Sequence, residues 1–226
     1  MAASVSGTTL IGRIRDLGGY RDPFITDTML LGWVNDSLAQ LWEIVIKHDP
    51  GRVLSAANVS VVSGTAAYNL ASDFYRIKGV AVADDASPDG WTTLERYMWP
   101  ERHGGAFGAD KLSARWDVQQ GQLWIWPKPE WSASVRVEYF PTAPQLATAA
   151  GTFDSINYWT EWVVFDVLVK CALKAEDDAK GWAIERDRRE ALIRGSTPQV
   201  NGGGPKVAVS IYDRGRRSRY RGRLRW

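Results

Sequence analysis

The stretch YWTEWVVFDVLVKCALKAEDD, residues 158–178, decides the fold of this chain. Apolar residues lie on almost every side of a helix drawn through it: Trp162, Val163, Phe165, Val167, Leu168, Val169, Cys171, Ala172 and Leu173. A helix that is apolar on most sides is buried among other elements. We therefore expect a helix here, packed by other helices of the same chain or of another subunit.

Three further stretches repeat apolar residues at helical spacing. The first runs from about Thr8 to Leu17, and the second covers residues 26–48 and ends before Asp49-Pro50-Gly51. A strongly charged helix is predicted over residues 181–193. Its inner side is expected to hold the apolar residues Trp182, Ile184, Ala191 and Leu192.

Between the second and third helices the pattern changes to that of β-strands. Segments with alternating or β-branched residues are 57–64, 77–82, 91–94 and 134–140, and residues 114–129 read as a hairpin that turns near Gln120-Gly121. We expect a compact antiparallel β unit of five or six strands.

The order of these elements predicts an α+β fold. It is an α-helical bundle of about four helices with an inserted antiparallel β domain and an extended C-terminal tail. The expected domains are a helical bundle (1–52 plus 150–195), the β domain (53–149), and a linker with a basic tail (196–226). Large aromatic residues are favoured where one side is buried and another meets a partner. The aromatic residues expected in bundle or ring packing are Trp33, Trp42, Trp162 and Phe165.

The charge of the chain is divided unevenly. Residues 205–226 hold eight Lys or Arg and one Asp, a net charge of +7. The whole chain carries +2, so residues 1–204 carry −5. An acidic body with a basic tail indicates two different contact surfaces.

Signs of catalysis, of a metal site or of a membrane span are weak. The two histidines, His48 and His103, fall at a helix end and in a glycine-rich loop, and one cysteine gives no zinc-site spacing. Pairs of carboxylates lie in polar stretches, where burial can hardly tune their pKa values. No run of eighteen apolar residues occurs. We expect no enzyme activity, no cofactor, no metal and no membrane partner; a cell-wall hydrolase is the weakest alternative.

Five segments in order resemble the head-to-tail adaptor (connector, or tail accessory) proteins of tailed bacteriophages, especially short-tailed ones. They are ITDTMLLGWVNDSLAQLWEIV, YNLASDFYRIKGV, WTTLER, QLWIWPKP with VRVEYFPTAPQL, and FDSINYWTEWVVFDVLVKCALKAEDD. The resemblance covers about residues 8–195. The chain departs from the family at Ala71, where proline is usual, and in its extra tryptophans.

The resemblance implies a structural virion protein of the neck, assembled in the host cytoplasm. Roughly a dozen copies would form a homo-oligomeric ring. That ring would bind the portal protein above and the tail nozzle or tube protein below, and genomic DNA would pass through its channel. The C-terminal segments would reach up to the portal.

The tail is the segment expected to dock on the portal. Val207, Val209 and Ile211 alternate on one face, as in a strand added to a partner's sheet edge. Arginines beyond this strand would pair with carboxylates, and aromatic residues would anchor them. The other docking residues are Tyr212, Arg214, Arg216, Arg217, Arg219, Tyr220, Arg221, Arg223, Arg225 and Trp226. Two alternatives stay open: a solvated basic tail, and a nucleic-acid-binding protein whose arginines bind phosphates.

Overall fold

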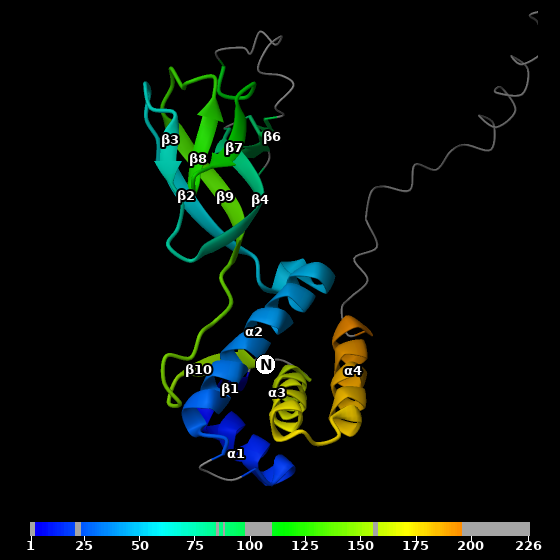
Figure 1. Ribbon diagram of the computed structural model, residues 1–226. Coiled ribbons are helices and arrows are strands. Elements are labelled where there is room, and N and C mark those ends of the chain that lie inside the picture. Colours follow the sequence, from blue (N-terminus) through cyan, green and yellow to red (C-terminus); the bar gives the residue numbers. More distant parts are fainter. Residues whose placement is uncertain are drawn as a thin grey trace, which may run out of the picture. The chain divides into compact units, whose positions relative to one another are not determined.

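The computed structural model describes residues 3–20, 24–84, 86–87, 89–97, 110–155 and 158–195. Chain contacts separate a unit Met1–Ser196 from a unit Thr197–Trp226, and all described residues belong to the first. They form four α-helices and three sheets whose strands are antiparallel apart from one pair (Figure 1). The predicted combination of helices with antiparallel sheets is confirmed. The predicted tail lies outside the described residues.

The four α-helices begin and end within three residues of the predicted ranges. They are α1 (Gly7–Gly18), α2 (Asp27–His48), α3 (Trp159–Ala175) and α4 (Lys180–Gly195). Side-chain caps explain the starts of α1 and α2: the Ser6 side chain accepts from the backbone N–H of Thr9, and the Thr26 side chain accepts from that of Met29. Helix α1 ends at Gly19, whose φ of 66° is left-handed.

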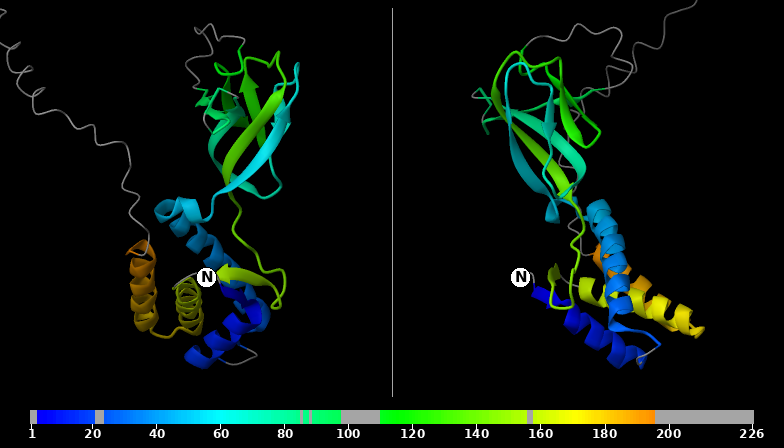
Figure 2. Two further views of the ribbon diagram at one scale, coloured as in Figure 1. Left: turned by 180° about the vertical axis from the view of Figure 1, so that it is seen from behind. Right: turned by 60° about the vertical axis from the view of Figure 1, so that its left-hand side comes forward.

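Helix α3 lies between α2 and α4 in both figures (Figures 1 and 2). It contacts α1, α2 and α4, as its apolar circumference predicts. Val163, Val167 and Leu168 are fully buried in the cluster that these helices share, which also holds Leu10 and Val34. We call α1–α4 and the residues packed on this cluster the helical part.

Helix α4 is rotated relative to the prediction. Of its expected inner side, Ile184 is 54% exposed, Leu192 is 41% exposed and Ala191 is also exposed. Ile193 is the buried residue instead, and Trp182 is half-buried. The reason is that α4 meets α3 through aromatic and ionic contacts of Trp182, Arg186 and Arg189, on the side where Ile193 joins the helical cluster.

The β part consists of two four-stranded sheets. One has the order β2-β9-β4-β5 and the other the order β3-β8-β7-β6. Their strands are β2 (Ser55–Val61), β3 (Ala67–Asn69), β4 (Phe74–Ala83), β5 (Trp91–Thr93), β6 (Glu95–Arg96), β7 (Arg115–Gln119), β8 (Gln122–Trp126) and β9 (Ala133–Pro141). Within the described residues the β part thus holds eight strands where five or six were predicted. Strands β3 and β6 have three and two residues, too few to show alternation.

The predicted hairpin is confirmed as β7 and β8. It turns at Gln120 and Gly121, whose φ values of 52° and 74° are both positive, as the tight hairpin turn requires. Leu123 and Ile125 on one face of β8 are fully buried in the apolar cluster of the β part. On the other face Trp124 stacks on Trp126, with ring centroids 5.8 Å apart.

A two-stranded sheet of β1 (Ala3–Ser6) and β10 (Thr152–Ser155) was not predicted. Its partners are about 150 residues apart in the chain, and neither is long enough to stand out. Phe153 of β10 belongs to the helical cluster. The pairing therefore ties the start of α1 to the segment that leads into α3.

Candidate functional site

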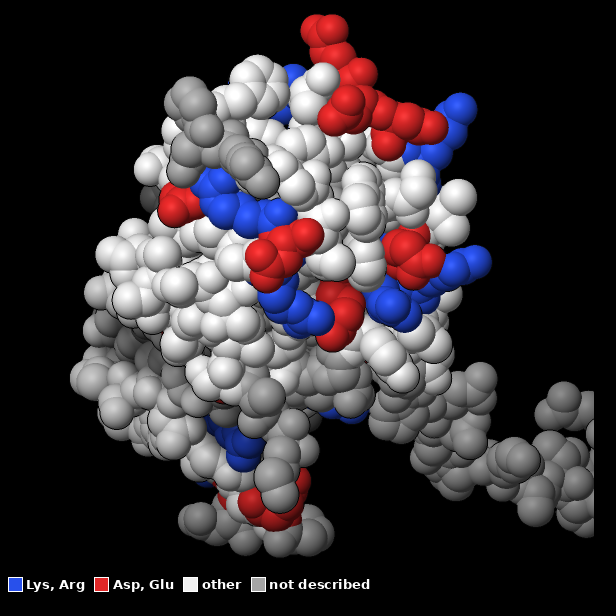
Figure 3. Space-filling model, turned by 90° about the horizontal axis from the view of Figure 1, so that it is seen from below, with Lys and Arg blue, Asp and Glu red and all other residues white. Residues whose placement is uncertain are grey.

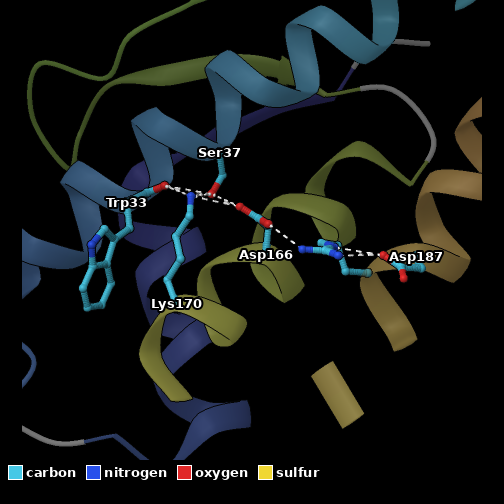
Figure 4. Close-up of polar contacts among 6 residues, drawn as sticks. Trp33, Ser37, Asp166, Lys170 and Asp187 are labelled. Carbon is cyan, nitrogen blue, oxygen red and sulfur yellow. Dashed lines mark hydrogen bonds and ion pairs between the residues drawn. The ribbon is translucent and has the colours of Figure 1, made fainter. Parts of the chain in front are cut away.

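A buried polar network joins three helices of the helical part (Figure 4). Asp166 of α3 is only 3% exposed. Its Oδ2 lies 2.7 Å from the Ser37 hydroxyl of α2 and 2.9 Å from Lys170 Nζ. Its Oδ1 lies 3.4 Å from a terminal nitrogen of Arg186 on α4. One carboxylate thus contacts α2, its own helix and α4.

The rest of the network continues on either side of Asp166. Lys170 Nζ donates to the Ser37 hydroxyl at 2.7 Å, and that hydroxyl also lies 2.8 Å from the Trp33 carbonyl oxygen. Arg186 donates to Asp187 at 2.8 Å. This hydrogen bond, with the charges of Asp187 and Asp166, raises the pKa of the Arg186 guanidinium. The network can fix the helices in register, because every one of its charged groups is paired within the protein.

Sequence reasoning missed this network. No role was predicted for Asp166. The available signal was a carboxylate inside a helix that is apolar on most sides, followed by Lys170 four residues later, because such groups are rarely buried unpaired.

The four aromatic residues proposed for packing all lie in or against the helical cluster. Trp162 is 2% exposed, whereas Trp33, Trp42 and Phe165 are partly buried. Phe165 stacks on Trp182 with ring centroids 6.1 Å apart. The Trp42 indole N–H donates to the Pro141 carbonyl at 2.8 Å, so it connects α2 to the end of β9. Their role in a ring stays a prediction.

An apolar pocket of about 440 Å³ opens beside the exposed side of α2. It is lined by Ala39, Gln40, Trp42 and Glu43 of α2, by Tyr75 of β4 and by Ala143. A hydrogen bond with Glu43 raises the pKa of the Tyr75 hydroxyl. We call this the α2 pocket. A mainly apolar lining with one carboxylate can hold an aliphatic side chain and pair with a cation next to it.

The proposed docking residues of the tail, Val207 to Trp226, lie outside the described residues, as does His103. Within the described ranges no three His, Cys, Asp or Glu residues gather as a metal site would require. The helices of the described ranges include none that is long and apolar enough to cross a bilayer. On the face in Figure 3, Lys and Arg lie interspersed with Asp and Glu.

The model of the SU10 adaptor protein family matches residues 6–202. The matched range takes in all four helices of the described chain and both four-stranded sheets. A comparison with curated proteins gives no match.

Proposed function

We propose that this chain joins the head of a phage to its tail. The chain belongs to the SU10 adaptor protein family and is thus a structural adaptor of a phage virion. Several copies form a ring beneath the portal protein, the tail nozzle attaches to the other side, and DNA leaves the head through the channel. The family match over residues 6–202 is the observation that carries this proposal.

The arrangement of charge supports a role for the tail in this assembly. The basic residues 205–226 follow a glycine-rich stretch, NGGG at 201–204, so they can reach a partner while the folded unit stays in place. Seven arginines suit a partner surface rich in carboxylates. We assign that surface to the portal.

The test is a phage whose gene for this chain carries an early stop codon. We expect filled heads that carry portal protein but no tail, and that lose their DNA on purification. Adding the purified chain should restore tail attachment, and electron microscopy should show new density below the portal. Complete, infectious particles without this chain would contradict the proposed function.

A further inference from the structure

Within the described residues, aliphatic side chains of helix α4 lie exposed on its outer side. Ile184 and Leu192 are eight residues apart and thus about 12 Å apart along the helix. Both lie on the exposed side, with Ala191 on the same side as Ile184 and the exposed Arg188 between Ile184 and Leu192. The rest of α4 is highly charged, with five Lys or Arg and three Asp or Glu. Aliphatic residues gathered on the outer side of such a helix mark a contact surface.

The α2 pocket has the complementary chemistry. Trp42 and Tyr75, residue types that interfaces favour, contribute to its lining, and Glu43 supplies a negative charge beside it. Helix α2 carries three Asp or Glu and one Lys, a net charge of −2, whereas α4 carries +2. The exposed Arg188 of α4 and the exposed Glu43 of α2 are opposite in charge, so they can pair across an interface.

The two surfaces are on different helices, so neighbouring copies can join them head to tail. Ala39, Gln40 and Glu43 lie on the exposed side of α2. Helix α4 packs mainly on α3 and also meets α2 (Figure 1). A contact between two different surfaces repeats from copy to copy and closes into a ring when the rotation allows it.

We propose that the exposed face of α4 in one copy docks in the α2 pocket of the next copy. Ile184 or Leu192 fills the apolar pocket, and Arg188 pairs with Glu43. Arg188 is 67% exposed, and its contact with Glu185 at 2.5 Å engages only one of the five N–H donors of a guanidinium. This contact rests on the proposed function, since it supplies the subunit interface of the ring.

The test is disulfide cross-linking in phage particles that carry Gln40→Cys and Ile184→Cys in this chain. The native Cys171 is fully buried, so it leaves the new pair as the reactive thiols. After mild oxidation, a non-reducing denaturing gel should show a ladder from dimer to the complete ring. Each single variant should stay monomeric. A second pair, Ala39→Cys with Arg188→Cys, tests the same contact at neighbouring positions.

Monomer alone with both pairs, in particles that contain a normal amount of the chain, would overturn the proposed contact. A dimer formed by Ile184→Cys alone would also overturn it, because α4 would then contact α4. Unmodified particles are analysed first: if they lack this chain, the proposed function fails, whatever the cross-links show.

Discussion

Asp166 on α3 and Ser37 on α2 are joined by a buried hydrogen bond of 2.7 Å, although 129 residues separate them in the chain. Lys170 and Arg186 complete the surroundings of the carboxylate. The helices are thus held together by a paired charge as well as by apolar contacts. Removing each kind of contact should lower the free energy of unfolding by an amount that can be measured separately.

The substitution Asp166→Ala should lower the free energy of unfolding by about 2–4 kcal/mol, because it leaves two cations without their shared partner. Urea unfolding followed by circular dichroism measures the loss. Asp187→Ala is the matched control: Asp187 is 64% exposed and also pairs with Arg186, so its loss should stay below about 1 kcal/mol. Equal losses for the two variants would show that the network does not stabilise the fold.

Trp162→Ala should cost about 3–5 kcal/mol, because a nearly fully buried indole leaves a large cavity. Phe165→Ala should cost only about 1–2 kcal/mol, since Phe165 is half-buried and its ring mainly contacts Trp182 and Arg189. The same unfolding measurement ranks the two. A larger loss of unfolding free energy for Phe165→Ala than for Trp162→Ala would contradict this ranking. It would mean that the contact of α3 with α4 contributes more to stability than the partial burial of Phe165 suggests.

Two glycines of α1 should respond oppositely to alanine. A Cβ at Gly12 meets nothing within 4 Å, so Gly12→Ala should stabilise the protein by up to about 1 kcal/mol. A Cβ at Gly18 would lie 2.7 Å from Leu168 and 2.5 Å from the Tyr20 ring, so Gly18→Ala should destabilise it. The melting temperatures of both variants test this prediction. A higher melting temperature for Gly18→Ala would contradict the close packing of Leu168 and Tyr20 against Gly18.

Burial raises the pKa of the Cys171 thiol from its ordinary value of 9.0 to about 11. The native protein should therefore not react with a thiol reagent at pH 8, while the engineered Ser60→Cys, at an exposed position, should react at once. The folded-state pKa is the higher one, so the contribution of the thiol to stability is complete below pH 9 and is lost as the pH rises towards 11. Cys171→Ala should lack this part of the pH dependence. Rapid labelling of native Cys171 would contradict its burial.

Removing residues 205–226 should leave the helical and β parts folded, as judged by circular dichroism, but abolish attachment to portal-bearing heads. Replacing the seven arginines by Gln should weaken attachment only in part, because the strand expected at Val207 to Ile211 would contribute as well. If the tail binds DNA instead, attachment should survive both changes. The intact chain should then bind duplex DNA, with a slope of log affinity against log salt of about −0.9 per phosphate. Binding to DNA-free portal rings separates the two outcomes.

The sequence predicted those elements whose pattern is long or whose turn is distinctive. The apolar run of α3 and the turn at Gln120 and Gly121 both carry a strong local signal. Strands β3 and β6 are too short for one, and β1 pairs with a segment about 150 residues away. Long-range pairing of short strands leaves no trace in local periodicity.

The candidate site was harder to predict for a different reason. The outward rotation of α4 follows from contacts of Arg186 and Arg189, whose charged side chains the apolar pattern would place in solvent. A buried cation is favourable only beside a partner such as Asp166 or the Phe165 ring, and that partner is on another helix. The α2 pocket likewise brings Tyr75 and Ala143 together from distant segments.

Ser55, at the start of β2, is paired with Tyr139, near the end of β9. The chain therefore enters and leaves the β part through neighbouring residues. Paired residues of antiparallel strands lie about 5 Å apart. A segment whose two ends lie side by side can be exchanged, enlarged or tagged without disrupting the fold of the rest of the chain. We therefore expect recombination between phages to exchange this β part as a unit, while the helices are retained.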